Sequence, residues 1–155
     1  MVLFDELGLE EGLIHSIKAL GFTQPTPIQE QAIPVLLKGT KDFVGLAQTG
    51  TGKTAAFGLP LLQLVNKQQK FPQALIICPT RELCLQITND LNSFKRKTDH
   101  IAVTAVYGGA SIGMQVRDLK KGTHMNQNPF HVVPDVSLYN MIYVNFFFDG
   151  CRIPV

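Results

Sequence analysis

Apolar residues recur in two alternating patterns along the first two thirds of the chain. Three short apolar runs are each followed by a segment with apolar residues at the three- and four-residue spacing of a helix. The runs and the segments that follow them are 42–47 with 53–65, 74–78 with 81–93, and 101–106 with roughly 111–119. Strands that alternate with helices in this way indicate a mostly parallel sheet flanked by helices. The pattern therefore predicts an α/β fold.

Two further helices are expected before the first strand. Residues 9–20 carry apolar side chains on one helical face, and Gly21 follows as a natural C-cap. The next helix is expected to begin after Thr26, because this threonine and Gln29 form a Thr-x-x-Gln capping box. Pro34 is expected to kink this second helix.

The overall composition suits a small domain that binds no membrane. A chain of 155 residues with 45% hydrophobic content can build a single core, and its net charge of +2 permits an anionic partner without requiring one. The three cysteines show no ligand-type pairing, which indicates reduced thiols and a cytoplasmic location. The N-terminus lacks the basic residues of a signal peptide, and no apolar stretch is long enough to span a bilayer.

The character of the sequence changes near residue 122. Residues 123–155 contain only three of the 26 charged residues but six of the thirteen aromatic ones, and they show no clear helical period. Parts of this segment are compatible with strands. We therefore expect one domain over residues 1–122, and we assign no domain to the atypical tail at 123–155.

The loop AQTGTGKT lies between the first expected strand and the helix that follows it. It matches the phosphate-binding pattern G-x-x-x-x-G-K-[ST], except that Ala47 replaces the first glycine. Gly50 and Gly52 allow a tight turn whose N–H groups face a triphosphate, whereas a plain linker turn would not need the Lys-Thr pair. Lys53 is expected to reach the β- and γ-phosphates, and Thr54 to ligate Mg²⁺. The expected nucleotide-binding residues are Ala47, Gln48, Thr49, Gly50, Thr51, Gly52, Lys53 and Thr54, the last two being the catalytic pair.

Three further motifs agree with this phosphate-binding loop. The stretch GFTQPTPIQ at 21–29, with Phe4 upstream of it, resembles the Q motif of the DEAD-box ATP-dependent RNA helicases. PTREL at 79–83 resembles motif Ia of that family, and Gly108-Gly109 resembles its glycine pair. The order and spacing of the motifs also resemble the family, in its bacterial form, up to about residue 122. The resemblance implies a P-loop RecA-like domain that binds ATP and Mg²⁺ and takes part in remodelling RNA duplexes.

The resemblance assigns recognition of the adenine base to the Q motif. Gln29 would read the adenine edge, since its amide offers both a donor and an acceptor. Phe22 would lie against the base with Phe4 behind it, and Gln24 stands where the family makes a backbone contact to the adenine. The alternative is that Gln29 only completes the capping box and that both phenylalanines are ordinary core residues.

The resemblance places RNA on motif Ia and on the glycine pair. Pro79, Thr80 and Arg81 would contact the sugar-phosphate backbone of single-stranded or duplex RNA at a helix N-terminus, where free N–H groups attract phosphate. Gly108 and Gly109 would let the RNA strand approach closely. Such contacts are independent of base sequence. The alternative is a capped helix that carries an ordinary Arg–Glu surface pair.

Several motifs of the family are absent from the sequence. The strand ending in Thr-Pro-Gly-Arg, the Asp-Glu-Ala-Asp motif and the Ser-Ala-Thr motif do not occur, and neither does a second RecA-like domain. We therefore expect a fold that is incomplete at its C-terminal end and a chain that binds ATP without hydrolysing it. The tail is interpreted as truncated, chimeric or out-of-frame sequence. Two alternatives remain: a non-catalytic module that binds adenine nucleotide or RNA, and an unrelated P-loop ATPase, against which the Q motif argues.

Overall fold

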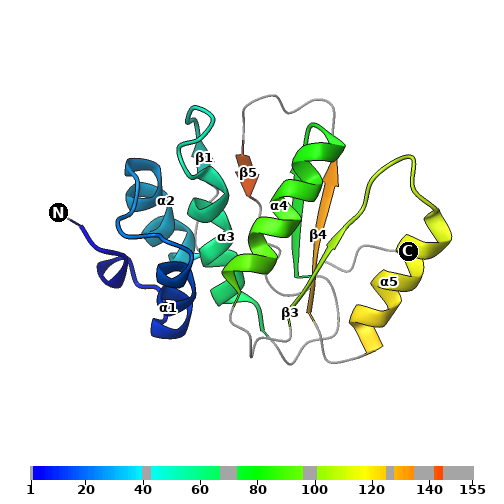
Figure 1. Cartoon of the computed structure of the whole chain (residues 1–155), viewed down its shortest axis with the longest axis horizontal. Helices are drawn as coiled ribbons and strands as arrows, with labels where there is room; N and C mark the ends of the chain where they lie inside the picture. The colour runs from blue at the N-terminus through cyan, green and yellow to red at the C-terminus, as the bar shows by residue number, and fades with distance from the viewer. Residues whose placement is uncertain are drawn as a thin grey trace.

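Helices and strands alternate along most of the chain, as the apolar pattern predicts (Figure 1). The structure, a computed structural model, describes residues 2–39, 43–66, 73–95, 101–124, 128–134 and 142–144, with side chains as far as residue 120. In chain order the elements are a 3₁₀ turn at Phe4–Glu6, α1 at Glu11–Ala19, α2 at Pro27–Lys38, β1 at Phe43–Gly45, α3 at Lys53–Leu64, β2 at Ala74–Cys78, α4 at Arg81–Phe94, β3 at Ile101–Ala105, α5 at Ile112–His124, β4 at Asn128–Pro134 and β5 at Ile142–Val144.

Two helices begin at the caps that the sequence predicts. The capping box of α2 is formed, and the backbone N–H of Thr26 donates to Oε1 of Gln29 at 2.9 Å. At the start of α4, the hydroxyl of Thr80 accepts the backbone N–H of Leu83 at 3.2 Å. Pro34 lies inside α2, which continues beyond it, so the kink expected at this residue stays a prediction.

Three parallel strands form the main sheet, in the order β2-β4-β3. Ala74 of β2 lies opposite Phe130 of β4, and Ile101 of β3 lies opposite Asn128. The central strand therefore comes from the segment after residue 122, for which no domain was predicted. The short strands β1 and β5 form a separate antiparallel pair. The predicted parallel sheet is thus found in β2, β3 and β4.

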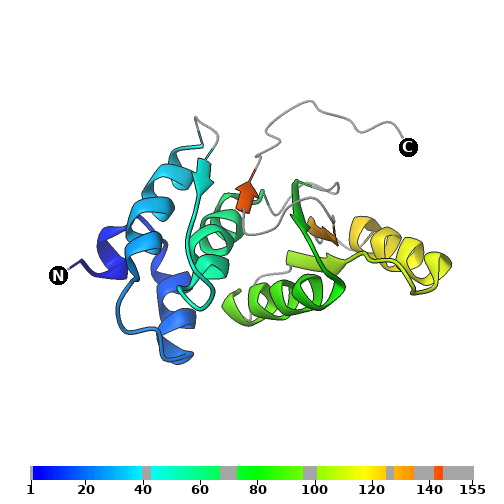
Figure 2. The ribbon, with the colours of Figure 1, turned by 90° about the horizontal axis from the view of Figure 1, so that it is seen from above.

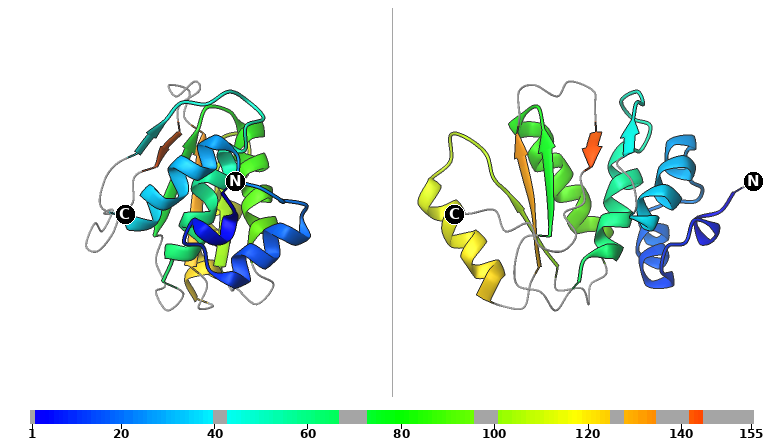
Figure 3. Two further views of the ribbon diagram at one scale, coloured as in Figure 1. Left: turned by 90° about the vertical axis from the view of Figure 1, so that its left-hand side faces the viewer. Right: turned by 180° about the vertical axis from the view of Figure 1, so that it is seen from behind.

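A single core joins the helices to one face of the strands. Helix α4 lies over this face, α3 packs beside α4, α1 and α2 lie beyond α3, and α5 lies beside β3 and β4 (Figure 2; Figure 3). The largest side chains of this core include Ile17 of α1, Ile33 of α2, Leu59 of α3 and Leu91 of α4, all buried. No helix in the described part of the chain is both long and apolar enough to cross a membrane.

The opposite face of the strands is partly exposed. Residues alternate along a strand, so Ala74, Ile76 and Cys78 of β2 are buried on the helix side. Ile77 on the other side is 36% exposed, and Val44 of β1 is 58% exposed. Among the described residues, no helix lies over β2 on this face, although α5 contacts β3 and β4 (Figure 3). These exposed apolar side chains agree with a fold that is incomplete.

Candidate functional site

The predicted phosphate-binding loop connects β1 to α3, as expected from the sequence. Gly50 and Gly52 have φ angles of 80° and 82°, in the left-handed region that favours glycine. Gly52 directly precedes α3, so the loop ends at the free N–H groups of the first helical turn. A turn of this kind, which ends on a helix N-terminus, has the donor chemistry to bind a phosphate group.

The Lys53 side chain folds back over its own loop. Its Nζ atom donates hydrogen bonds to the backbone carbonyls of Ala47 and of Gln48, the latter at 2.8 Å. The hydroxyl of Thr51 donates to the same Gln48 carbonyl at 2.8 Å. The ammonium group is therefore held at the loop by oxygen atoms, which are the kind of acceptor that a phosphate also offers.

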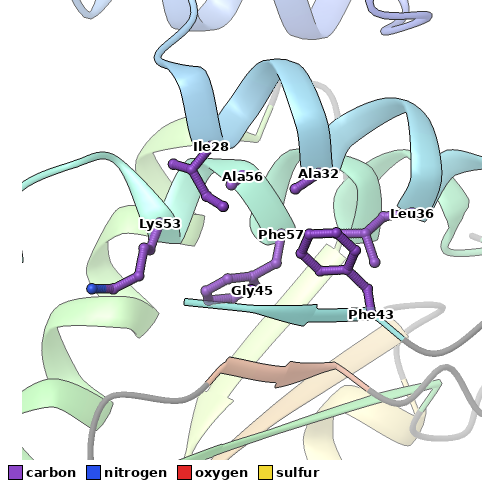
Figure 4. A pocket seen from close by; sticks show the side chains of 8 residues that line it. All are labelled: Ile28, Ala32, Leu36, Phe43, Gly45, Lys53, Ala56 and Phe57. Carbon is purple, nitrogen blue, oxygen red and sulfur yellow. The ribbon is translucent and has the colours of Figure 1, made fainter. Parts of the chain in front are cut away.

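An apolar pocket lies behind this loop, between α2, α3 and β1. Its walls include Ile28, Leu36, Phe43 and Phe57 (Figure 4). Lys53 also borders the pocket, but its Nζ atom points away from the apolar side chains. The pocket is therefore part of the apolar packing beneath the loop, and the hydrogen bonds of Lys53 Nζ lie outside the pocket.

Gln29 connects the Q motif to the phosphate-binding loop. It is 1% exposed, the only buried polar side chain among the described residues with known exposure. Its Nε2 atom donates to the carbonyl of Gly52 at 3.1 Å, while Oε1 accepts the N–H of Thr26. The Thr26 hydroxyl also donates to the carbonyl of Thr51 at 2.8 Å. The capping role of Gln29 is confirmed, and its recognition of adenine stays a prediction.

Three aromatic rings lie in a row beside the Q motif. The ring centroids of Phe4 and Phe22 are 6.3 Å apart, and those of Phe22 and Phe94 are 5.6 Å apart, both pairs edge to face. Phe4 is buried in the core against Phe22, which fits both its expected support of Phe22 and the alternative of ordinary core packing. Sequence reasoning missed Phe94, whose only signal was its place on the apolar face of α4. Gln24 lies exposed in the loop before α2. Contact of Phe22 and Gln24 with a base stays a prediction.

Thr54, the expected Mg²⁺ ligand, lies near Asp90 of α4. Burial raises the pKa of Asp90, and the neighbouring Thr54 hydroxyl opposes this rise. Nothing in the sequence singled out Asp90. In the described part of the chain, no group of three or more His, Cys, Asp or Glu side chains could hold a metal ion. The role of Thr54 toward Mg²⁺ therefore stays a prediction.

The structure brings motif Ia and the glycine pair together. Pro79 and Thr80 follow β2 and the glycine pair follows β3, so the parallel strands carry both motifs to one edge of the sheet. The central guanidinium carbon of Arg81 lies 4.6 Å from the centroid of the Tyr107 ring. At Gly109, where φ is 83°, an added Cβ would lie 3.9 Å from Nη1 of Arg81. Arg81 is therefore stacked on a ring at the glycine turn.

Tyr107 and Gln115 are two residues of this surface that sequence reasoning did not identify. The side-chain amide of Gln115, on α5, forms hydrogen bonds with the backbone N–H and carbonyl of Tyr107. An aromatic residue before a glycine pair was the only local signal for Tyr107. Gln115 had none, because its partners lie in another element.

The neighbouring thiols of Cys78 and Cys84 are buried, and neither is in a disulfide. Burial, reinforced by the adjacent Cys84 thiol, raises the pKa of Cys78 to about 12, and burial also raises the pKa of Cys84. Thiols of this kind carry little thiolate at neutral pH and are poor nucleophiles. Cys78 and Cys84 are therefore buried structural residues.

Comparison with known proteins identifies relatives of this chain. A family model described as DEAD/DEAH box helicase matches residues 26–133, which include most of β4. The ATP-dependent RNA helicase CshA of Listeria monocytogenes is 51% identical over 122 residues, which make up 78% of this chain and 23% of that protein. The DEAD-box ATP-dependent RNA helicase CshA of Bacillus cereus is 46% identical over 125 residues, or 81% of this chain and 23% of the relative. The chain thus spans about a quarter of the length of these relatives.

Two solved structures share the fold. A DEAD box protein from the hyperthermophile Methanococcus jannaschii matches with a TM-score of 0.74 and 34% identity, over 86% of this chain and 35% of that one. The RNA-helicase Prp28 from Chaetomium thermophilum bound to ADP matches with a TM-score of 0.72 and 36% identity, over 86% of this chain and 32% of that one. The RecA-like α/β fold predicted from the sequence is confirmed.

Proposed function

The chain belongs to the DEAD/DEAH box helicase family, and we propose that it binds ATP at residues 47–54 and RNA at the surface formed by motif Ia and the glycine pair. The observation that carries the nucleotide assignment is the hydrogen bond from buried Gln29 to the carbonyl of Gly52. It sets the expected adenine-reading residue directly beside the phosphate-binding loop. The names of the relatives, ATP-dependent RNA helicases, support both ligands.

In this proposal, ATP replaces contacts that the loop makes with itself. Lys53 exchanges the carbonyls of Ala47 and Gln48 for phosphate oxygens, which are better partners for an ammonium group because they are charged. The first N–H groups of α3 face the same anion. The Gln29 amide turns from the loop to the adenine edge, and the Phe22 ring packs against the base.

The proposed function also involves Mg²⁺, which would bind to this chain, and a second RecA-like domain, which would lie outside it. Mg²⁺ would neutralise charge on the phosphates, and the Thr54 hydroxyl is the group that would hold it. A second RecA-like domain would complete the helicase, and a cytoplasmic location is consistent with the reduced thiols. Remodelling of RNA duplexes is proposed for such a complete protein.

We further propose that this chain alone binds ATP without hydrolysing it. Its sequence contains no Asp-Glu-Ala-Asp motif, whose acids would orient the attacking water. The same absence favours a second candidate function, a non-catalytic module that binds adenine nucleotide or RNA. Neither candidate predicts release of phosphate by this chain alone; they differ in whether RNA would stimulate release of phosphate by a complete protein that contains it.

Titration with fluorescent ATP and GTP analogues, with and without single-stranded RNA, tests the proposal. Lys53→Ala should weaken ATP binding about 10- to 100-fold, since charge-assisted hydrogen bonds contribute about 1.5–3 kcal/mol. Lys38→Ala removes an equal charge from an exposed position on α2 and should leave binding unchanged. Unchanged affinity in Lys53→Ala would overturn the phosphate site. Equal affinity for ATP and GTP would overturn the adenine role of Gln29.

A further inference from the structure

We propose that Tyr107 and Gln115 are positioning residues for RNA binding. Gln115 fixes the backbone at the Gly108-Gly109 turn, and Tyr107 holds the guanidinium of Arg81 beside that turn. The inference rests on the proposed RNA surface and extends it to two residues outside the family motifs.

Gln115 bridges the two ends of the glycine turn with one side chain. Its Oε1 atom accepts the N–H of Tyr107 at 2.9 Å, and its Nε2 atom donates to the carbonyl of Tyr107 at 3.1 Å and to the carbonyl of Ala110 at 3.4 Å. Tyr107 lies just beyond the end of β3, so the amide takes the place that the peptide group of a neighbouring strand would take. The half-buried Gln115 thereby ties α5 to the turn and fixes its shape.

Tyr107 restrains Arg81 without using its hydrogen-bond donors. The guanidinium carbon lies over the ring at 4.6 Å from the centroid, a cation–π contact. Because the ring face supplies no oxygen acceptor, the N–H donors of the guanidinium remain available for phosphate oxygens. A restrained side chain also loses less conformational freedom when it binds.

The arrangement places the arginine and the turn on one surface. The backbone of Gly109 lies close to the Arg81 side chain, since a Cβ added to Gly109 would lie 3.9 Å from Nη1 of Arg81. A phosphate bound by Arg81 would therefore lie near the glycine backbone. Because Gln115 holds the turn and Tyr107 holds the arginine, loss of either should weaken RNA binding and leave ATP binding unchanged.

Fluorescence anisotropy with a short labelled oligouridylate tests the role of Tyr107 in the full chain. Tyr107→Leu should weaken RNA binding about two- to fivefold, the effect of losing an exposed cation–π contact. Tyr107→Phe keeps the ring and should bind like the wild type. If Tyr107 acts through Arg81, the double variant Arg81→Ala/Tyr107→Leu should bind no more weakly than Arg81→Ala alone.

Gln115→Met tests the turn with a side chain of similar shape and no amide. We expect it to weaken RNA binding about threefold to tenfold, because the hydrogen bonds that fix the turn are lost. Gln31→Met, at an exposed position on α2, is the matched control. Affinity for the ATP analogue should stay unchanged in both variants. An equal loss of RNA and ATP affinity in Gln115→Met would show general unfolding and overturn its role as a positioning residue.

The outcomes separate the inference from the proposed function. If Arg81→Ala leaves RNA affinity unchanged, the proposed RNA surface is wrong and the inference falls with it. A different outcome is that Arg81→Ala weakens RNA binding while Tyr107→Leu has no effect alone, or while the double variant binds RNA more weakly than Arg81→Ala. In either case only the role of Tyr107 is wrong. NMR tests the stacking without RNA: ring currents should shift the Arg81 side-chain signals in the wild type and in Tyr107→Phe but not in Tyr107→Leu. Identical shifts in all three would overturn the stacking.

Discussion

Gly52 is the point at which the phosphate-binding loop and the buried Gln29 amide meet, so its replacement tests how firmly the two are linked. The φ angle of Gly52 is 82°, and an added Cβ would lie 2.3 Å from Nε2 of Gln29. No methyl group fits at that distance. Gly52→Ala must therefore displace an amide that is only 1% exposed.

The expected loss of stability at Gly52 has two contributions. Alanine in the left-handed region costs about 1–2 kcal/mol relative to glycine. The displaced Gln29 amide also leaves buried polar groups without their partners, which costs about 1–3 kcal/mol. We therefore expect the free energy of unfolding to fall by about 2–5 kcal/mol. The melting temperature should fall by about 4–20 °C, at roughly 2–4 °C per kcal/mol for a chain of this size.

Urea and thermal unfolding, followed by far-ultraviolet circular dichroism, measure this loss against a matched control. Gly21 has a φ angle of 90°, but an added Cβ there meets no atom within 4 Å. Gly21→Ala therefore carries only the backbone contribution, and Gly52→Ala should be less stable by a further 1–3 kcal/mol or so. Equal losses in the two variants would refute the conclusion that the Gln29 amide holds the loop.

Three more predictions concern the core beneath the site. Burial raises the pKa of Asp90, so the folded chain binds this proton more tightly than the unfolded chain and loses stability as pH rises above 3.8. Asp90→Asn should therefore be more stable than the wild type at pH 7, and urea titrations should show that this gain disappears below pH 3.8; a constant difference would contradict the pKa shift. Because the pKa values of Cys78 and Cys84 are raised, iodoacetamide at pH 8 should modify both thiols far more slowly in the folded chain than in the urea-unfolded chain. Peptide mass spectrometry measures the two rates, and equal rates would contradict the burial of the thiols. Gly58→Ala places a Cβ 2.5 Å from Cδ2 of Leu91. Overpacking should cost about 1–3 kcal/mol and outweigh the gain in helix propensity of about 1 kcal/mol, so the melting temperature should fall. A higher melting temperature than that of the wild type would contradict the close packing of α3 and α4.

Local signals in the sequence were enough to predict most elements of the fold. The strand 74–78 matches β2, and the helices expected at 53–65 and 81–93 match α3 and α4 to within one residue at each end. Caps and apolar spacing depend on residues only three or four positions apart, so they can be recognised without knowing the path of the chain. The capping box of Thr26 and Gln29 is of this kind.

Contacts between distant segments could not be predicted in this way. The amide of Gln29 reaches Gly52, 23 positions along the chain, and Asp90 reaches Thr54 from another helix. Gln115 likewise reaches back to Tyr107. Each contact depends on how helices pack over the strands, and no local spacing encodes that packing. The resemblance to a family placed the motifs, whereas the side chains that support them became visible only in three dimensions.

The strand order has a consequence for how the chain assembles during its synthesis. Strand β4 lies between β2 and β3, yet the ribosome makes it after both. A nascent chain that has emerged only as far as Ala105 therefore holds two strands with no backbone hydrogen bonds to each other. At about 5–20 residues per second, the roughly thirty residues to Pro134 take on the order of 2–6 s to appear. During this interval both strand edges can pair with other chains, and the sheet closes only when its last-made strand inserts.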